Sequence, residues 1–352
     1  MSFNVSARAA AWRGLSPWVA AGNLLAIGSV IRFRTPLKFF VRSLGQPRLT
    51  HAWLARIVQP DLAPLWAAHP RLATKLQRPY VSSAWSKLER FGALIGHYDA
   101  LPRFFRAAVR QAIYREGVVL FHLMNESSGR RLEVSLVYRD QFEKEGELTL
   151  LLRDVAAGVD LAGITFCVAC NAGQRVLIVG GLQASPHPQM RELIHDVAKE
   201  CHGLRPKAFA LWCLQQLASV WKVAQIQAVD DAQHIYRDRH KRREIAASYN
   251  EFWSESDGRR IPGGAWELPL VPRLRARAEL KPNRRKAYER RYAMLDAIRP
   301  GLLDIVRSLA PDARHGEIPG HEPPAIILKR REPSAPAKAA VDECAAEPSG
   351  AF

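Results

Sequence analysis

Residues 203–207, Gly-Leu-Arg-Pro-Lys, could bind a phosphate group, because they directly precede an apolar stretch that predicts a helix. The first turn of a helix has unpaired backbone N–H groups and the positive end of the helix dipole, and both attract anions. Arg205 and Lys207 would add positive charge. We therefore predict that Gly203, Arg205 and Lys207 contact the phosphates of a cofactor. The alternative is that Gly203 and Pro206 only end one helix and begin the next, with both cations in water.

A second set of side chains could transfer protons. Glu147 begins one predicted strand, whereas His234 and Tyr236 follow directly after another, residues 224–229. Ligands of α/β sheets bind in crevices at the ends of strands. Transfer of an acyl group from a thioester to an amine needs a general base and a proton donor for the leaving thiolate. For an enzyme of this kind we predict Glu147, His234 and Tyr236 as catalytic residues; the alternative is a structural role for each of them.

The cysteines indicate neither a disulfide framework nor a metal site. The chain of 352 residues has five of them: Cys167, Cys170, Cys201, Cys213 and Cys344. Cys167 and Cys170 form a Cys-x-x-Cys motif, but the apolar run around them predicts a strand, in which the two side chains point to opposite faces. No second pair completes four zinc ligands. We predict buried cysteines in a reducing, cytoplasmic environment and no metal.

The charge of the chain favours partners that carry phosphate. Lysine and arginine number 51 against 34 aspartate and glutamate, which gives a net charge of +17. Nucleic acid, anionic lipid and nucleotide-bearing cofactors all fit this charge. No helix-turn-helix, zinc-finger or RNP-type motif is present, so sequence-specific nucleic-acid binding is not expected. We predict a phosphate-bearing small molecule or an anionic lipid as the partner, with a protein partner as an alternative.

Three regions are expected along the chain: a helical N-terminal region at residues 1–120, a core domain at residues 121–310 and a disordered tail at residues 311–352. Periodic apolar residues, broken by prolines, predict helices in the first region. Proline and alanine dominate the last region, which indicates that it does not form a packed structure.

The core domain is predicted to be α/β (α+β), with a mixed, largely antiparallel sheet and flanking helices. Four runs of strand character are separated by turn residues, at residues 130–139, 146–154, 160–170 and 174–183. Two helices, a strand, a charged helix and a last strand follow, beginning with the helices at residues 189–201 and from Pro206 onward. The second of these helices is apolar nearly all round, so we expect it to be buried on most sides.

Residues 14–31 lack any charge and follow two arginines, so a signal peptide or a membrane span must be considered. Ser, Pro, Asn and Gly interrupt the segment, and no cleavage site of small residues follows it. We predict a helix that is buried or lies on the membrane surface. The predicted location is the cytoplasm, with peripheral contact to the inner membrane as an alternative.

The second half of the core carries a series of motifs in a recognisable order. Gly-Leu-Arg-Pro-Lys is followed by a short strand, His-x-Tyr-Arg at residues 234–237, Tyr-x-x-Phe-Trp at residues 249–253 and a basic block that ends in Tyr-x-x-Arg-Tyr at residues 288–292. Over about residues 50 to 300 the chain resembles the VirK/YbjX family of Gram-negative bacterial proteins. The resemblance implies links to envelope integrity, virulence and resistance to antimicrobial peptides, but no settled reaction. Asp230 and Asp231 replace the family's usual Ser-Asn, so no role is carried over to these two positions.

The predicted order of strands and helices is also similar to that of the GNAT acyltransferases, in which a helix N-terminus holds the pyrophosphate of an acyl-coenzyme A. In that group the phosphate loop directly follows the fourth strand and has a second glycine, whereas here the helix at residues 189–201 intervenes and Gly203 is alone. This resemblance implies a GNAT-like core and acyl-coenzyme A as the cofactor. Two functions stay open: an acyltransferase-like enzyme, and a non-catalytic basic adaptor that binds envelope lipid, a partner protein or RNA.

Overall fold

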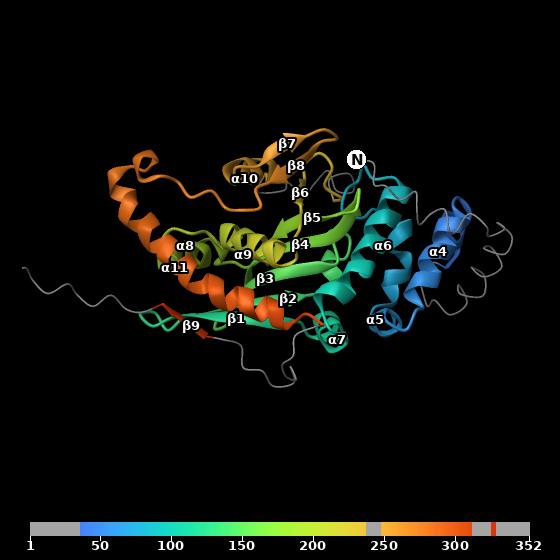
Figure 1. Ribbon diagram of the computed structural model, residues 1–352, viewed down its shortest axis with the longest axis horizontal. Helices are drawn as coiled ribbons and strands as arrows, with labels where there is room; N and C mark the ends of the chain where they lie inside the picture. Colours follow the sequence, from blue (N-terminus) through green and yellow to red (C-terminus); the bar gives the residue numbers. More distant parts are fainter. Residues whose placement is uncertain (1–35, 237–247, 312–324, 329–352) are drawn as a thin grey trace, which may run out of the picture.

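Nine strands form one mixed sheet in the computed structural model, which describes residues 36–236, 248–311 and 325–328 (Figure 1). They are β1 (Val118–Asn125), β2 (Arg131–Val137), β3 (Leu148–Asp154), β4 (Val159–Asn171), β5 (Gln174–Gln183), β6 (Gln225–Val229), β7 (Arg259–Ile261), β8 (Ala265–Leu268) and β9 (Ala325–Leu328). Their order is β7-β8-β6-β5-β4-β3-β2-β1-β9. Among these described strands, only β5 and β6, and β1 and β9, run parallel to each other. The predicted mixed, largely antiparallel sheet with flanking helices is confirmed.

Three strands of the sheet are not predicted from the sequence. β1 is a continuous apolar run, which without alternation is difficult to distinguish from the end of the preceding helical region. β7 is only three residues long. The prediction of a disordered tail is wrong for Ala325–Leu328, because these residues pair with β1 as β9. The other tail residues after 311 lie outside the described residues, as do residues 14–31.

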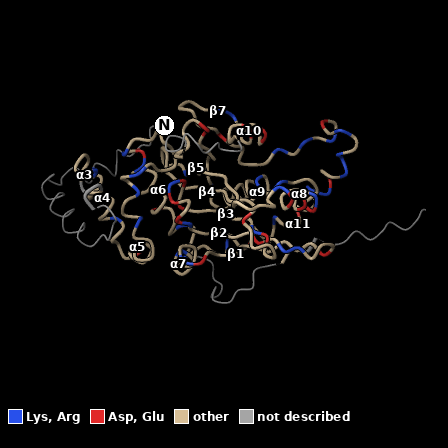
Figure 2. Tube along the Cα trace, turned by 180° about the vertical axis from the view of Figure 1, so that it is seen from behind, with Lys and Arg blue, Asp and Glu red and all other residues tan. Residues whose placement is uncertain are grey.

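Helices lie both against the sheet and at the two ends of the molecule. They are α3 (Pro36–Leu44), α4 (Pro47–Ile57), α5 (Ala63–Ala68), η1 (Pro70–Gln77), α6 (Lys87–Phe104), α7 (Ala107–Arg115), η2 (Asp140–Phe142), α8 (Met190–Glu200), α9 (Pro206–Val220), α10 (Tyr249–Glu255), η3 (Arg277–Glu279) and α11 (Pro282–Ser308). Figures 1 and 2 show α3 to α5 at one end of the molecule and α8 with the start of α11 at the other. None of the described helices is both long and apolar enough to cross a bilayer.

Helix α9 is the central helix of the fold, and its predicted burial is confirmed. Proline occupies its first turn, where no backbone N–H is needed. Trp212, Leu214 and Leu217 are all buried. The helix packs on β3 and β4. Trp221, directly after its last turn, lies 6.2 Å from Phe166 of β4, measured between ring centroids. Packing on several sides therefore explains why α9 is apolar nearly all round.

Helix α6 lies along the part of β4 that extends beyond β3. The pairing of β3 with β4 ends at Leu148 and Phe166. Past that point Nδ1 of His97 in α6 accepts the backbone N–H of Val168, with 3.2 Å between the two nitrogens. Burial, with a smaller contribution from the charge of Lys75, lowers the pKa of His97 to about 3. His97 is therefore a neutral hydrogen-bond acceptor that completes this part of the sheet.

Substitution of His97 by asparagine is expected to weaken the pH dependence of stability below neutral pH. The unfolded chain takes up a proton near the ordinary pKa of 6.5, whereas folded His97 does so only at about 3, so stability is lost as the pH falls through this range. The loss for one such group is about 2 kcal/mol at about pH 5. Asparagine has an oxygen that can accept the same N–H but does not titrate. Urea unfolding at neutral and acidic pH measures the difference, and equal losses in both proteins would contradict this role of His97.

The two cysteines of the Cys-x-x-Cys motif lie in β4, as predicted, and differ in exposure. Cys167 is buried and Cys170 is exposed. The prediction of buried cysteines is therefore wrong for Cys170. It lies near the end of β4, and side chains three positions apart in a strand point to opposite faces, so only one of the two faces the core.

Candidate functional site

Three buried glutamates precede β3 at every second position: Glu143, Glu145 and Glu147. A carboxylate inside a protein needs a cation or hydrogen-bond donors close by. Glu143 is held by two arginines at the ends of η1, Arg71 at 2.9 Å and Arg78 at 2.8 Å. The other two glutamates have partners of their own, so this short segment connects several distant parts of the chain.

Glu147, a predicted catalytic residue, is enclosed between the helices and the sheet. Nζ of Lys75 lies 2.7 Å from its Oε2, and the hydroxyl of Tyr98 donates to the same oxygen at 2.6 Å. All three side chains are buried. Burial lowers the pKa of Lys75, although the charge of Glu147 opposes this shift. Glu147 thus already has a charge partner, and a catalytic role for it stays a prediction.

Glu145 forms a second buried pair, with His234. Nε2 of His234 lies 3.2 Å from Oε1 of Glu145, and the side chains are 4% and 0% exposed. The side-chain amide of Gln183 donates a hydrogen bond to the same oxygen. Burial raises the pKa of Glu145, and the contact with His234 opposes this shift. Neither Nδ1 nor Nε2 of His234 has a hydrogen-bond partner among the described residues, so the contact of Nε2 with Glu145 is close but lacks the geometry of a hydrogen bond. We call Glu145 and His234 the acid–histidine pair.

Two glycines of β5 make room for this pair. A Cβ atom at Gly180 would overlap with the backbone carbonyl of Glu145, and a Cβ atom at Gly181 would overlap with its carboxylate. The register between β4 and β5 shifts at this place, so β4 and β5 have a bulge there. The Gly-Gly sequence in an otherwise apolar strand is therefore explained by the close approach of Glu145.

The acid–histidine pair lies where two parallel strands separate. The pairing of β5 with β6 ends at Val179 and Ala228. Beyond these residues, the backbone N–H of Leu182 donates a hydrogen bond to the hydroxyl oxygen of Tyr249, with 3.2 Å between the two atoms. Side chains thus replace strand pairing between the diverging ends of β5 and β6. Ends of parallel strands that diverge in this way are common ligand sites in α/β proteins.

Two tyrosines lie against the imidazole of His234. The ring of Tyr249 meets it edge-on at 5.0 Å between centroids, and the ring of Tyr236 lies at 5.6 Å. Burial, with the negative charge of Glu145, raises the pKa of Tyr236 to about 12. Its phenol therefore keeps its proton at neutral pH. Nζ of Lys144 lies 5.4 Å from the centre of the Tyr236 ring and places a positive charge over it.

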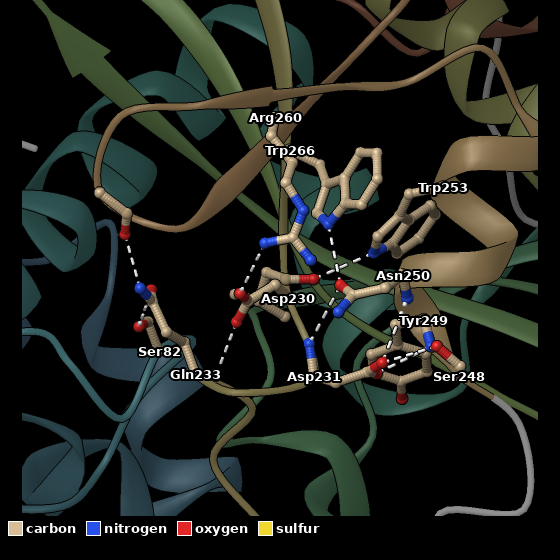
Figure 3. A network of polar contacts seen from close by, with 12 residues as sticks. Ser82, Asp230, Asp231, Gln233, Ser248, Tyr249, Asn250, Trp253, Arg260 and Trp266 are labelled. Carbon is tan, nitrogen blue, oxygen red and sulfur yellow. Dashed lines mark hydrogen bonds and ion pairs between the residues drawn. The ribbon is translucent and has the colours of Figure 1, made fainter.

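The loop that carries His234 is fixed by the two aspartates that follow β6 (Figure 3). The carboxylate of Asp231 accepts two hydrogen bonds from the start of α10. One comes from the hydroxyl of Ser248 at 2.7 Å and the other from the backbone N–H of Tyr249 at 2.8 Å. Asp230 lies 3.6 Å from Arg260 of β7. These contacts connect the end of β6 to α10 and to the β7–β8 hairpin. They fix the backbone just before the acid–histidine pair.

The predicted phosphate contacts lie between α8 and α9. Gly203 adopts a φ of +81°, a left-handed conformation that favours glycine. Arg205 occupies the N-cap position of α9 and makes no side-chain cap, and burial lowers the pKa of Lys207. A third cation comes from α11, because the guanidinium of Arg291 donates to the carbonyl of His202 at 3.1 Å. The N-terminus of α9 is therefore surrounded by positive side chains.

Only part of the predicted site is brought together. His234 and Tyr236 lie in one cluster and Glu147 in another, and no hydrogen bond between described residues joins either cluster to residues 203–207. Glu145 is not among the residues predicted from the sequence. A signal for it exists in the three acidic residues at every second position before a strand. Within the described part of the chain, no group of three or more potential metal ligands lies together.

Comparison with known proteins identifies relatives without a described activity. Residues 28–303 match the family model described as "Protein of unknown function (DUF535)". The chain is 34% identical to "Uncharacterized protein YbjX" of Escherichia coli over 276 residues, which are 77% of this chain and 83% of the relative. It is 26% identical to an "Uncharacterized protein" of Haemophilus influenzae over 191 residues, 54% of this chain and 62% of the relative. No solved structure matches it significantly.

Proposed function

The chain belongs to the VirK/YbjX family and matches the model described as "Protein of unknown function (DUF535)", and from this premise we propose that it is an acyltransferase-like enzyme. The donor would be an acyl-coenzyme A and the acceptor an amine. The family resemblance suggests a role in envelope integrity, virulence or resistance to antimicrobial peptides. The cysteine content favours a place in the cytoplasm, with peripheral contact to the inner membrane as the alternative.

The observation that carries this proposal is the acid–histidine pair at the divergence of β5 and β6. It combines a buried carboxylate, an imidazole with a free Nδ1 and a neutral phenol within one cluster. The last four of the five antiparallel strands (β2 to β5), a crossover through α8 and α9, β6, α10 and the β7–β8 hairpin also follow one another in the order that suggests a GNAT-like core.

The proposed reaction divides two proton transfers between His234 and Tyr236. The amine attacks the thioester carbonyl, its proton goes to Nδ1 of His234, and the carboxylate of Glu145 stabilises the imidazolium. As the carbon–sulfur bond breaks, Tyr236 gives its proton to the leaving thiolate. The phenolate then regains a proton from the imidazolium, so an amide and a thiol leave and the enzyme is unchanged.

The donor phosphates would bind at the N-terminus of α9. Binding of acetyl-coenzyme A, measured by calorimetry on the full chain, is expected to weaken at least about tenfold when Arg205 and Lys207 are both replaced by glutamate. Two attractive charges become repulsive there. Arg205 is exposed and Lys207 is half-buried, so unfolding measurements on the variant check that the fold persists.

A matched control is the replacement of Arg103 and Arg115 by glutamate, because both are exposed and lie on α6 and α7. This variant should bind acetyl-coenzyme A as the wild type does. Equal weakening in both variants would mean that only the overall charge matters. No binding by the wild type would contradict the proposal and favour the second candidate, a non-catalytic basic adaptor.

A further inference from the structure

Residues 270–274, between β8 and η3, expose a cluster of apolar side chains. Eight large apolar side chains are exposed among the described residues, and three of them are here: Leu270, Val271 and Leu274. Val271 is 76% exposed and Leu274 is 61% exposed, the two highest values of the eight. Single exposed apolar residues are common on protein surfaces, but a cluster marks a place of contact.

Positive charge surrounds this cluster. From Arg273 to Arg291 the chain has nine lysines and arginines against two glutamates. Figure 2 shows them in blue along the segment that leads to α11 and along the start of that helix. Arg273 is paired with Glu279 at 2.8 Å, whereas Arg275 makes no ion pair with any described residue. Surplus cations of this kind attract a polyanionic surface.

A pocket of about 190 Å³ lies beside the cluster, between it and helices α9 and α11. Its lining includes Trp212 of α9, Arg275 and Arg291. Trp212 is 3% exposed, and its indole N–H has no hydrogen-bond partner in the described structure. The pocket is thus lined by an aromatic side chain and two guanidinium groups, a combination that suits a ligand with both apolar and anionic parts.

We propose that residues 270–275 and the start of α11 form a docking surface for an anionic bilayer. Lipid phosphates bind Arg275 and Arg291 at the pocket, and Val271 and Leu274 enter the apolar region below the headgroups. Apolar residues next to cations suit a bilayer interface, which offers both environments within a few ångströms. RNA would use the cations but would leave Val271 and Leu274 in water.

This proposal does not rest on acyl transfer, because none of its residues contacts the acid–histidine pair in the described structure. Arg291 is shared with the proposed phosphate site at the N-terminus of α9, so the docking surface is tested at Val271, Leu274 and Arg275, which that site does not use.

Flotation of the full chain with lipid vesicles tests the docking surface. The wild type should float with phosphatidylcholine vesicles that contain about one third phosphatidylglycerol and should not float with phosphatidylcholine alone. Replacement of Val271 and Leu274 by aspartate should weaken binding roughly tenfold or more, because two apolar side chains no longer enter the bilayer. Arg275→Gln should weaken it roughly fivefold, the contribution of one cation near the surface.

Val58, directly after α4, and Leu88 of α6 provide the matched control, since they are 43% and 45% exposed and lie outside residues 270–275. Their double replacement by aspartate should leave flotation unchanged. Equal flotation of the Val271→Asp, Leu274→Asp variant and the wild type would overturn the proposal. So would release of the protein by inorganic phosphate at the concentration of the lipid phosphate, because the ligand would then be a soluble anion. Binding of single-stranded RNA without flotation would overturn it in favour of a nucleic-acid surface.

Discussion

Replacement of Lys75 by methionine is expected to lower the free energy of unfolding by about 3–5 kcal/mol, because it leaves a buried charge without its partner. Lys75 and Glu147 are both buried, with 2.7 Å between Nζ and Oε2. Methionine fills a similar volume but carries no charge, so Glu147 would have to stay ionised unpaired or take up a proton. Urea or guanidinium unfolding at neutral pH measures the change.

A second substitution separates charge from packing in this experiment. Glu147→Gln in the Lys75→Met background removes the unpaired charge and keeps an acceptor for the Tyr98 hydroxyl, so part of the lost stability should return. Arg307→Met is the surface control, because its pair with Asp304 is largely exposed and should contribute less than about 1 kcal/mol. A similarly small loss for Lys75→Met would show that the buried pair does not stabilise the fold.

Replacement of His234 by alanine is expected to lower the rate of acyl transfer by roughly 10²–10⁴-fold, the usual contribution of a general base. Thiol release from acetyl-coenzyme A, with water as the acceptor, is a readout that needs no knowledge of the natural amine. Glu145→Gln should lower the rate as well, because a neutral amide no longer stabilises the imidazolium. The affinity for the donor, measured by calorimetry, should not change in either variant.

Exposed His195 of α8 gives the control for this prediction, because its side chain is 77% exposed and lies outside the acid–histidine pair. His195→Ala should release thiol at the wild-type rate. Thiol release by His234→Ala at the wild-type rate would contradict the proposed role of His234. Unfolding measurements on the same variants distinguish a loss of catalysis from a loss of structure.

Local signals were sufficient for the middle of the sheet and for α9. β2 to β5 are apolar runs of strand length bounded by turn residues, and these features do not depend on distant parts of the chain. Likewise, an apolar surface on all sides of a helix requires burial wherever that helix lies. β1 and β9 could not be found in this way, because β1 directly follows the helical region and β9 lies in a tail in which proline and alanine dominate.

The sequence by itself determined the family, the core of the sheet, the burial of α9 and the surplus of positive charge. Only the tertiary structure decided which charged groups meet. Glu147 pairs with Lys75, 72 positions away. His234 pairs with Glu145 and not with Glu147. Glu145 and Glu147 occupy equivalent positions in the local sequence pattern, so this pattern does not distinguish their partners. Their partners depend on how η1, β5 and the loop after β6 pack around them, and no local pattern encodes that packing.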